Sequence, residues 1–420
     1  MSFELSPDFK TTECQDFCAR VADGTHDSPK ETAVGKKLVT SKNVKGGRLE
    51  LDSAYLISAE DFESINKRSK VDQWDLLLTM IGTVGEVCLV TDPEPDFAIK
   101  NVGLLKCGNE LKAKWLYYFL RSPQGQKLIE ARKKGSTQQY VSLTELRRLP
   151  ISYPDDQSVM RRIVEDLSAI DDRITLLRET NTTLEAIAQA LFKSWFVDFD
   201  PVHAKMQGRA PEGMDEATAA LFPASFEESE LGSVPLGWST GKLADIASLK
   251  GGKMLDKTSF SDSGANPVFG GAGVMGFSDL SNSEGFVITV GRVGAYCGQY
   301  FWHQGRAWVN NNASLVSPIN PDDSCWLFLW LKNVDMDLIK KGAAQPFVSN
   351  GDISDLKIVL PPSFVVDKFV QFVEPIFKKL SLIREKTQSL EVLRDTLLPR
   401  LISGQLRLPD EESLTEEAVV

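Results

Sequence analysis

The 420-residue sequence lacks the features that identify several large classes of protein. Its longest strongly apolar run, Cys325–Leu331, is far shorter than the ~20 residues of a membrane-spanning helix. The first residues, Met1–Lys10, do not place an apolar stretch after a basic one, so no secretory signal is predicted. Six cysteines are scattered through the chain, which is typical of reduced thiols rather than of a disulfide framework. We therefore expect a cytoplasmic protein that has no contact with a membrane.

Signs of catalysis are equally sparse. No Gly-x-x-x-x-Gly-Lys-Ser/Thr loop occurs, and the three histidines are isolated from one another. The glycine pattern Gly271–Gly276 resembles a dinucleotide-binding loop, but neither a helix nor a suitably spaced acid follows it. Cys14 and Cys18 with His26 lack a fourth zinc ligand at usable spacing. We predict no catalytic residue, no metal site and no bound cofactor.

A loose nuclease pattern is the main exception. Asp96, Glu110 and Lys112 follow the acid, acid, lysine order with which metal-dependent nucleases hold Mg²⁺ and activate water. In the second copy of the sequence, described below, the positions of Glu110 and Lys112 are taken by Pro321 and Asp323. A single-chain nuclease therefore stays an alternative that is confined to one copy.

Two long stretches have the repeat of a coiled-coil helix. Within 155–199, apolar residues recur in alternating steps of four and three, the ~3.5-residue repeat of a seam between paired helices. The same frame returns within 362–408, and each helix should be about 60 Å long at ~1.5 Å per residue. The first seam contains Ile163, Leu167, Ile170, Ile174, Leu177, Asn181, Leu184, Ala188, Leu191 and Trp195, and the second contains Phe369, Val373, Ile376, Leu380, Ile383, Thr387, Leu390, Arg394, Leu397 and Leu401.

Asn181 and Thr387 are polar residues at matching positions near the middle of the two seams. A single polar residue in an apolar seam can fix which residues of two helices pair. We therefore hypothesise that Asn181 and Thr387 meet across the seam and set the register of the helices.

The globular parts of the chain are duplicated as well. Thr79–Gly85 matches Ile288–Gly294, and Lys133–Pro154 aligns without gaps on Lys340–Pro361. The identical residues in the longer alignment are, in the first copy, Lys133, Lys134, Gly135, Gln138, Val141, Ser142, Leu149, Ile151 and Pro154. These matches indicate a tandem duplication in which each copy is a globular domain followed by a long helix.

We predict an α+β fold with two globular domains, separated by two long antiparallel coiled-coil helices and related by pseudo-twofold symmetry. The front halves of the domains, Gly24–Gln73 and Gly251–Phe277, differ in length and show no match. Within the first domain, Lys114–Lys134 is predicted as one helix. The predicted parts are domain one (1–154), a central helix (155–199), a linker (200–237), domain two (238–361), a distal helix (362–408) and an acidic tail (409–420).

Polar loops are the best candidates for a binding site. The net charge of −11 argues at first against nucleic acid, but a near-neutral domain can still present a basic face. The loops combine cations for phosphates with amides that can pair bidentately with adenine, and the set occurs in both copies. The predicted DNA-binding residues are Lys133, Lys134, Ser136, Thr137, Gln138, Gln139, Arg292, Asn310, Asn311, Asn312, Lys340, Lys341 and Gln345.

Two further segments resemble a known family. Leu184–Pro201 (LEAIAQALFKSWFVDFDP) and Leu397–Leu406 (LLPRLISGQL) are typical of the central and distal regions of the specificity subunit of type I restriction-modification systems. The Gly82–Gly85 and Lys133–Ser142 motifs and their second copies also fit. The resemblance covers about residues 10–408.

The resemblance implies a non-catalytic DNA-specificity subunit. Each of two target-recognition domains would recognise one half of a split, asymmetric site in double-stranded DNA, and the helices would set the spacer between the halves. Two modification subunits, which bind S-adenosylmethionine and methylate adenine, would dock on the helices and the central region. A restriction subunit that uses ATP and Mg²⁺ would join for cleavage in phage defence.

The candidates for contact with the modification subunits are Phe192, Trp195, Phe196 and Phe199. This aromatic cluster is larger than a two-helix seam needs, and aromatic side chains are common anchors at protein interfaces. Burial against the chain's own domains is the alternative. For the whole chain, a coiled-coil scaffold that binds only protein is a further alternative to a DNA-specificity subunit.

Overall fold

The computed structural model describes residues 7–342 and 345–407, and the chain forms two compact units. Unit 1 combines the first part of the chain, Met1–Thr175, with its last part, Gln388–Val420. Unit 2 is the segment between them, Leu176–Thr387. The predicted acidic tail, 409–420, lies outside the described residues. Within the described ranges, no helix is both long enough and apolar enough to cross a membrane.

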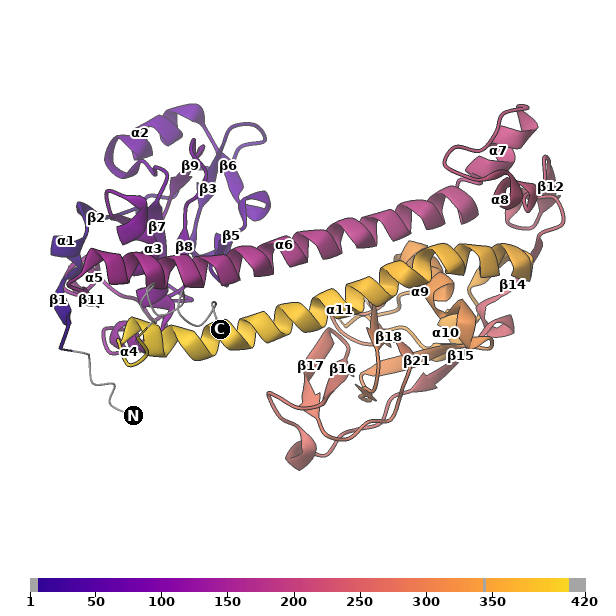
Figure 1. Ribbon diagram of the computed structural model, residues 1–420. Coiled ribbons are helices and arrows are strands. Elements are labelled where there is room, and N and C mark those ends of the chain that lie inside the picture. The colour runs from indigo at the N-terminus through magenta and orange to yellow at the C-terminus, as the bar shows by residue number, and fades with distance from the viewer. Residues whose placement is uncertain (1–6, 343–344, 408–420) are drawn as a thin grey trace, which may run out of the picture. The chain divides into compact units, whose positions relative to one another are not determined.

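Two unbroken helices of 40 residues each, α6 (Gln157–Phe196) and α11 (Ser363–Ile402), contribute to both units (Figure 1). The Asp156 carboxylate accepts a hydrogen bond from the Ser158 N–H at 2.7 Å, a contact that satisfies a free donor at the start of α6. Every position of the two predicted seams is buried or half-buried. The prediction of two long helices with apolar seams is therefore confirmed.

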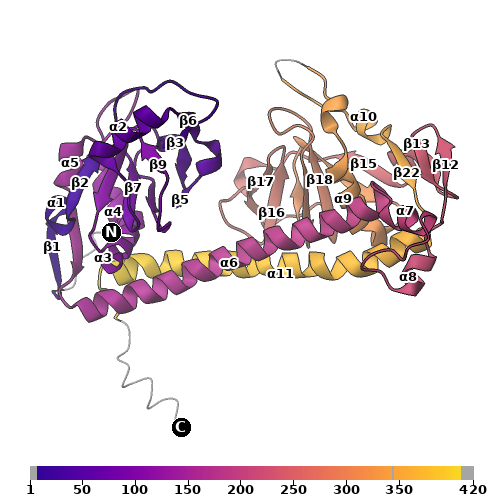
Figure 2. The same cartoon turned by 90° about the horizontal axis from the view of Figure 1, so that it is seen from above.

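Unit 1 is built on a four-stranded antiparallel sheet in the order β2-β10-β7-β8. Figure 2 labels β2 and β7 of this sheet. A second sheet, β6-β3-β9, contains one parallel pair, and β1 pairs with β11 directly before α6. Its elements are β1 (Phe9–Glu13), α1 (Cys14–Phe17), β2 (Arg20–Asp23), β3 (Lys36–Val39), η1 (Ser41–Asn43), β4 (Val44–Lys45), β5 (Arg48–Leu49), η2 (Leu51–Ser53), β6 (Tyr55–Ile57), α2 (Ala59–Ser69), β7 (Asp75–Thr79), β8 (Val87–Leu89), β9 (Phe97–Ile99), β10 (Val102–Lys106), α3 (Glu110–Arg121), α4 (Pro123–Glu130), α5 (Leu143–Arg147) and β11 (Pro150–Pro154).

Unit 2 repeats this plan. Its four-stranded antiparallel sheet has the order β15-β21-β18-β19, its second sheet the order β17-β16-β20, and β14 pairs with β22 directly before α11. Its elements are α7 (Asp200–Met206), α8 (Glu216–Ala220), β12 (Phe226–Ser229), β13 (Gly232–Pro235), β14 (Ser239–Lys242), η3 (Leu243–Asp245), β15 (Ala247–Gly251), η4 (Lys257–Ser259), β16 (Asn266–Gly270), β17 (Gly273–Ser278), β18 (Phe286–Gly291), β19 (Tyr300–Gln304), β20 (Trp308–Val309), β21 (Ala313–Pro318), η5 (Pro321–Asp323), α9 (Ser324–Asn333), η6 (Met336–Leu338), α10 (Asn350–Ser354) and β22 (Lys357–Leu360).

The duplication extends into the front halves, where the sequence shows no match. In unit 1, β3 pairs in parallel with β9 and antiparallel with β6. In unit 2, β16 pairs in parallel with β20 and antiparallel with β17. Two sequences without detectable similarity thus form the same three-stranded arrangement.

One predicted helix is wrong in its extent. The stretch Lys114–Lys134 contains two helices, because α3 ends at Arg121 and α4 begins at Pro123. The Ser122 hydroxyl caps α4 by accepting from the Gly125 N–H at 3.2 Å, and Pro123 takes the first-turn position that tolerates proline. A serine followed by a proline is typical of the start of a helix. The apolar repeat continues across Ser122 and Pro123, so it does not reveal this second helix start.

The predicted linker, 200–237, contains regular structure. It forms α7, α8 and the β12–β13 hairpin, and Asp215 caps α8 by accepting from the Thr218 N–H at 2.6 Å. Val202 and Phe222 are buried in the core of unit 2. This segment therefore packs as part of unit 2.

Both long helices are part of each core. In unit 1, Leu167 of α6 and Leu401 of α11 are buried in the same cluster as Trp115 of α3. In unit 2, Phe192 of α6 and Phe369 of α11 share a cluster in the same way. Neither core is complete without residues from two distant parts of the chain.

One seam position in unit 1, Arg394, carries a charged side chain instead of an apolar one. Arg394 on α11 donates to the Asp171 carboxylate on α6 at 2.8 Å. The same carboxylate accepts from the Tyr118 hydroxyl of α3 at 3.1 Å and lies 3.8 Å from Arg121. Asp171 thus joins three helices. Its side chain and that of Arg394 are 22% and 14% exposed, so solvent screens their attraction only in part.

We predict that Asp171→Ala lowers the free energy of unfolding of unit 1 by about 2 kcal/mol, because half-buried Arg394 would keep only Asp395 of its two carboxylate partners and Tyr118 would lose its acceptor. Chemical denaturation followed by tryptophan fluorescence measures this loss. Asp52→Ala is the control, since its ion pair with Lys37 is exposed and should contribute less than about 0.5 kcal/mol. Equal effects of the two substitutions would contradict this role of Asp171.

Candidate nucleic-acid interface

The predicted DNA-binding residues of unit 2 gather at one edge of its four-stranded sheet. Since β21 is antiparallel to both β15 and β18, the ends of β15 and β18 and the start of β21 lie at this edge. Arg292 follows β18 directly, and Asn310–Asn312 precede β21. The Arg292 N–H donates to the Asn312 carbonyl at 3.1 Å, so the structure brings these predicted residues together.

Arg292 has an unused donor at this edge. Its Nε is buried without a hydrogen-bond partner, and within residues 7–342 and 345–407 the guanidinium forms no ion pair. A buried donor without an acceptor costs free energy, but Nε itself is covered, so a ligand at this edge would contact the exposed part of the half-buried guanidinium. The guanidinium lies beside Gly251, where a Cβ would be 3.5 Å from Nη1.

The asparagines beside Arg292 are held through their backbone. The Asn310 N–H donates to the Phe269 carbonyl at 2.8 Å, and the Asn310 side-chain oxygen accepts from the Asn311 N–H at 2.7 Å. Asn311 and Asn312 are exposed. Their backbone is therefore held at the sheet edge, and their side-chain amides are open to solvent.

The polar loop of unit 2 is attached to the same edge. Lys341 and Phe347 close the loop by exchanging two backbone hydrogen bonds of 3.0 and 2.8 Å. Val348 donates to the Arg292 carbonyl at 3.0 Å, and Gly294 donates to the Pro346 carbonyl at 2.9 Å. Gln345 in this loop is exposed.

Unit 1 has the same edge, with β2 and β7 ending where β10 begins. Lys134 and Tyr140 close its polar loop through hydrogen bonds of 2.8 and 2.9 Å, and Gly82 donates to Gln139 at 3.2 Å. The loop residues Ser136, Thr137, Gln138 and Gln139 are exposed.

A glycine allows the close approach of chain segments at each edge. Gly24 after β2 donates to the Val102 carbonyl at 2.9 Å, and Gly252 after β15 donates to the Ala313 carbonyl at the same distance. A Cβ on Gly24 would lie 2.3 Å from the Ile99 oxygen, and one on Gly252 would lie 2.1 Å from the Asn310 oxygen. Only glycine fits at these two equivalent positions.

The side chains at the two edges differ, although the backbone plan is the same. In unit 1 the exposed His26 contacts Asn101 at 2.9 Å and Asp23 at 3.0 Å, and Arg68 lies 3.3 Å from Asp23. Met80 takes the structural position of Arg292, because Val141 donates to the Met80 carbonyl as Val348 donates to the Arg292 carbonyl. Sequence reasoning missed Asp23, His26 and Arg68, because their proximity depends on strand pairing between distant segments.

The four predicted loop lysines already have carboxylate partners in their own units. In unit 1 the ion pairs are Lys133–Glu130 at 2.5 Å and Lys134–Glu145 at 2.9 Å. In unit 2 they are Lys340–Asp337 at 2.6 Å and Lys341–Asp352 at 2.7 Å. A phosphate would have to compete with these carboxylates for the lysines.

The two equivalent carboxylates respond to their lysines. The Lys134 ammonium lowers the pKa of the Glu145 carboxyl below its ordinary value. In unit 2, hydrogen bonds from Lys341 and from Ser349 lower the pKa of Asp352 to about 2. The charged form of each carboxylate is therefore favoured by its lysine.

The aromatic cluster predicted to dock a partner is largely internal. Phe192 has none of its surface exposed and lies 5.9 Å, between ring centroids, from Phe369. Trp195 is 4% exposed and lies 5.2 Å from Phe222. Direct partner contact is thus wrong for Phe192 and Trp195, because the chain's own core covers them.

Phe196 and Phe199 are half-buried and pack on the same core. Phe196 lies 4.9 Å from Phe369, and Phe199 lies 5.6 Å from Trp238. Each keeps some exposed surface, so a role of these two residues in docking stays a prediction.

The polar pair of the seam lies within unit 2. The Thr387 hydroxyl is buried and donates to the Ile383 carbonyl of its own helix at 2.8 Å. The Asn181 side-chain oxygen is buried without a hydrogen-bond partner. The hypothesis that the two residues set the helix register stays a prediction.

The residues of the alternative nuclease site do not converge. Asp96 pairs with Lys36 at 2.7 Å, Glu110 pairs with Lys114 at 2.7 Å, and Lys112 lies over the Phe17 ring. In the described part of the chain, no three His, Cys, Asp or Glu side chains are placed to hold a metal ion.

Cys14 and Cys18, the two cysteines considered as zinc ligands, also lie apart from His26. Cys14 and Cys107 each lie 3.9 Å from Cys18, between sulfur atoms, in the core of unit 1. His26 contacts Asp23 and Asn101 instead.

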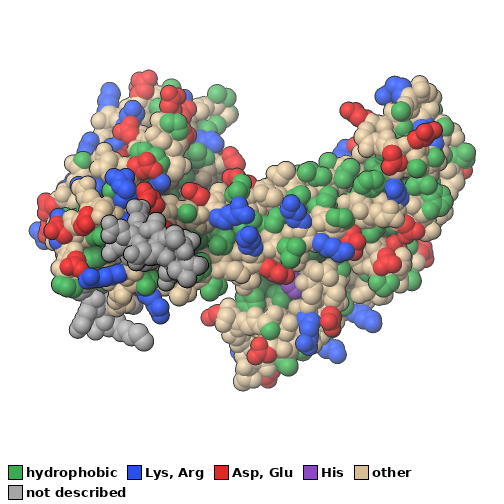
Figure 3. All heavy atoms as spheres, viewed as in Figure 1, with side chains coloured by type: hydrophobic (Ala, Val, Ile, Leu, Met, Phe, Trp, Pro, Cys, Tyr) green, Lys and Arg blue, Asp and Glu red, His purple; other side chains and the backbone are tan. Residues whose placement is uncertain are grey.

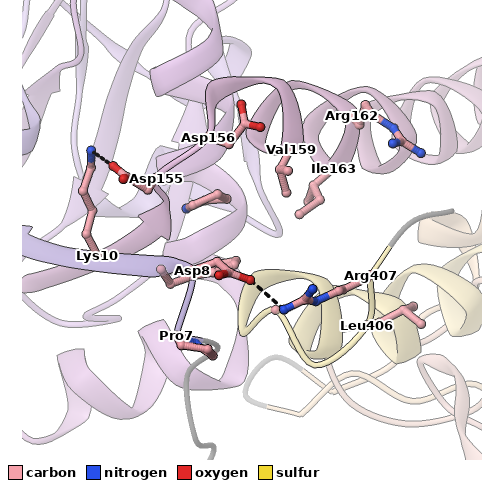
Figure 4. Close-up of a pocket in the computed structure, with 13 residues that line it drawn as sticks. Pro7, Asp8, Lys10, Asp155, Asp156, Val159, Arg162, Ile163, Leu406 and Arg407 are labelled. Atoms are coloured by element: carbon pink, nitrogen blue, oxygen red, sulfur yellow. Dashed lines mark hydrogen bonds and ion pairs between the residues drawn. The ribbon is translucent and has the colours of Figure 1, made fainter. Parts of the chain in front are cut away.

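A cavity of about 940 Å³ lies at the end of unit 1 where α6 begins (Figure 4). Lys10 pairs there with Asp155 at 2.5 Å, and Asp8 pairs with Arg407 at 2.6 Å. On the face of unit 1 seen in Figure 3, acidic and basic side chains are likewise interspersed. Neither surface presents charge of a single sign to a ligand.

Known proteins resemble this chain along most of its length. A family model for the type I restriction modification DNA specificity domain matches residues 8–186 and 235–392. The HindI type I restriction enzyme specificity subunit of Haemophilus influenzae is 27% identical over 348 residues, which cover 67% of this chain and 74% of the relative. The MjaIX specificity subunit of Methanocaldococcus jannaschii is 23% identical over 358 residues, covering 80% and 78%.

A solved structure shares the fold. The S subunit of a type I restriction-modification system from M. genitalium superposes with a TM-score of 0.58 at 20% sequence identity. The superposition covers 98% of both chains.

We predict that Phe192→Ala costs about 4 kcal/mol of unfolding free energy, because it leaves a cavity among the aromatic rings of unit 2. Equilibrium denaturation of the purified chain, without any partner, measures this cost. Phe364→Ala, on an exposed part of α11, is the control and should cost less than about 0.5 kcal/mol. A stable Phe192→Ala chain would show that the core of unit 2 does not depend on this ring.

We also expect Lys341→Ala to raise the pKa of Asp352 from about 2 toward the ordinary value of 3.8. Because the folded pKa lies below the unfolded one, this carboxylate stabilises unit 2 above pH 3.8, and the stabilisation is lost as the pH falls toward 2. Titration of the carboxyl ¹³C resonance by NMR measures the shift. Lys340→Ala, which removes the partner of Asp337, should leave the Asp352 titration unchanged.

Proposed function

The chain belongs to the type I restriction modification DNA specificity family, and from this premise we propose that each unit recognises one half of a bipartite, asymmetric DNA site. The proposal assigns no catalytic step to this chain. Its role is to direct adenine methylation, and cleavage where a restriction subunit is present, to one sequence.

The observation that carries the proposal is the equivalence of the two sheet edges. Strand order, the close-approach glycines and the closed polar loops are alike in both units. Asn101 and Asn312 hold equivalent positions, but other side chains there differ, with His26 and Met80 in unit 1 against Arg292 and Asn311 in unit 2. A common frame with unlike donors and acceptors is what two different half-sites require.

Arg292 is the residue best suited to contact DNA in unit 2. Guanidinium groups bind guanine O6 and N7 bidentately, or phosphate, and Arg292 is half-buried beside the exposed Asn311 and Asn312. Asn311 and Asn312 beside it can pair with adenine. The loop amides Gln138, Gln139 and Gln345 are further candidates, whereas the paired lysines are weaker ones.

We assign the spacer function to α6 and α11. Each has 40 residues, about 60 Å at ~1.5 Å per residue, and each contributes to both cores. The length of the unread DNA between the half-sites would follow from these helices.

The partners follow from the same proposal. Two modification subunits would supply S-adenosylmethionine and the methyl transfer, and a restriction subunit would supply ATP-driven motion and Mg²⁺-dependent cleavage. This chain would supply the DNA contacts and the surfaces on which those subunits assemble.

The test is co-expression with the modification subunit, followed by mapping of methylated adenines in the host genome. We expect one bipartite motif. Exchange of residues 1–153 for the corresponding domain of a relative should change one half of the motif and leave the other half and the spacer unchanged.

A matched exchange of residues 238–361 should change only the other half. If a stable complex forms but no motif is methylated, or if one exchange alters both halves, the assignment of one half-site to each unit is wrong. If the original motif is retained after both exchanges, the partner subunit and not this chain determines the methylated sequence.

A further inference from the structure

A chain of hydrogen-bonded polar side chains lies at the sheet edge of unit 1. The His26 imidazole lies between two oxygens, with Nε2 3.0 Å from the Asp23 carboxylate and Nδ1 2.9 Å from the Asn101 side-chain oxygen. Arg68 lies 3.3 Å from the other carboxylate oxygen of Asp23 and donates to the Gly24 carbonyl at 2.9 Å. Both imidazole nitrogens are therefore occupied within the chain, and His26 has no nitrogen left for a DNA base.

The backbone of Asn101 is held as well. Asn101 has a φ of 54°, a left-handed conformation that asparagine tolerates better than most residues. Its N–H donates to the Thr25 carbonyl at 3.1 Å. The Nδ2 end of its amide is open to solvent and donates to no other residue within 7–342 and 345–407. Asn101 thus presents one free donor at this edge.

The equivalent asparagine of unit 2, Asn312, is not held in this way. Counted from the equivalent glycines Gly24 and Gly252, Met254 takes the position of His26. A methionine side chain has no donor for an amide oxygen. Asn312 is exposed, and its side chain forms no hydrogen bond to any residue that the structure describes. Both ends of its amide are therefore free.

This difference changes what the two amides can bind. A free asparagine amide pairs bidentately with adenine, since it accepts from the N6 amino group and donates to N7. Asn312 has both groups available. Asn101 has its oxygen turned toward His26, so its free Nδ2 suits an acceptor on a base edge, such as N7 or O6 of guanine or O4 of thymine. Two equivalent asparagines can thus select different bases.

The protonation of His26 decides which end of the Asn101 amide faces outward. A carboxylate and an amide oxygen only accept hydrogen bonds, so this arrangement needs a proton on both ring nitrogens. When solvent removes the proton from Nδ1, that nitrogen becomes an acceptor, and the amide must turn Nδ2 toward the ring. The amide oxygen then faces outward and suits the amino group of adenine or cytosine. Imidazole is the side chain whose charge changes between about pH 5 and 8.

The charged groups near this imidazole are Asp23, Arg68, Asp27 and Lys100. Asp23 on β2 contacts the ring directly, and its side chain is only 14% exposed. Arg68 on α2 contacts Asp23 rather than the ring. Asp27 and Lys100 bind the hydroxyl groups of a neighbouring threonine and serine, at 3.4 and 2.6 Å. The protonation of His26 is thus coupled first to Asp23.

We propose that Asp23 and His26 are positioning residues that fix the Asn101 amide, so that the two units make different base contacts from equivalent asparagines. The inference rests on the proposed function, because it takes DNA as the ligand of both sheet edges. Its consequence is that only the half-site of unit 1 is recognised in a pH-dependent way.

The test uses the full chain with its modification subunit and the bipartite motif mapped from methylated adenines. Methylation rates are measured between about pH 5 and 8 on duplexes that carry each base at each position of the motif. Ratios between duplexes cancel the pH dependence of methyl transfer itself. We expect Asn101→Ala to lose about tenfold discrimination at one position of the unit 1 half-site, and His26→Ala to lose it at the same position.

The pH profile separates positioning from a structural role. In the wild type, the preference at this position should move, as the pH rises, from bases with an acceptor toward bases with an amino group. His26→Asn keeps a donor near the place of Nδ1 but cannot be protonated, so it should restore the discrimination and abolish its pH dependence. Met254→Ala, at the equivalent position of unit 2, is the matched control and should leave both half-sites unchanged.

Circular dichroism melting shows whether each variant is folded. Full discrimination at every position by folded His26→Ala overturns the proposal and leaves the proposed function intact. The proposal is also overturned if Asn101→Ala loses no discrimination, or if both half-sites show the same pH dependence. If the wild type with its modification subunit methylates no bipartite motif, the proposed function fails, and this inference fails with it.

Discussion

The burial of two apolar helix seams is the constraint on which the rest of the structure depends. A 40-residue amphipathic helix is not stable alone in water and needs a partner along its whole length. The chain meets this need by giving each long helix a place in both cores, with Leu167 and Leu401 in unit 1 and Phe192 and Phe369 in unit 2. The sheets of each unit thus pack against segments of both α6 and α11.

This arrangement leaves the far edge of each four-stranded sheet free for function. The long helices and the short helices α3 and α9 contribute much of the cores, while Gln138, Asn311 and Asn312 at this edge are exposed. Equivalent glycines fix the backbone there, and the side chains between them differ between the units. Because the residues that pack the core are largely different from those exposed at the sheet edge, the same fold can present different side chains to a ligand in each unit.

The features of this structure that the sequence predicts correctly are those marked by a repeating pattern in the sequence. The seam period identified both long helices, and the internal matches identified the duplication. The split of α3 and α4 was missed because the apolar pattern continues across Ser122 and Pro123. The common topology of the front halves was missed because strand pairing, not residue identity, preserves it. Phe192 was misassigned, since its burial depends on Phe369 and Trp326, far away in sequence. The pairing of Arg292 with Asn312, in contrast, agrees with the predicted set.

The division of unit 1 between the two ends of the chain has a consequence for biosynthesis. Residues 7–175 are synthesised before unit 2, but Leu398, Leu401 and Ile402, which complete their core, are synthesised after it. Unit 2 is contiguous and can close while the nascent chain is still growing. The N-terminal segment of unit 1 must therefore wait, with apolar surface uncovered, until Leu398–Ile402 have been made, and it needs a chaperone during this interval more than unit 2 does. Loss of Leu398–Ile402 would leave incomplete a core most of which is made long before them.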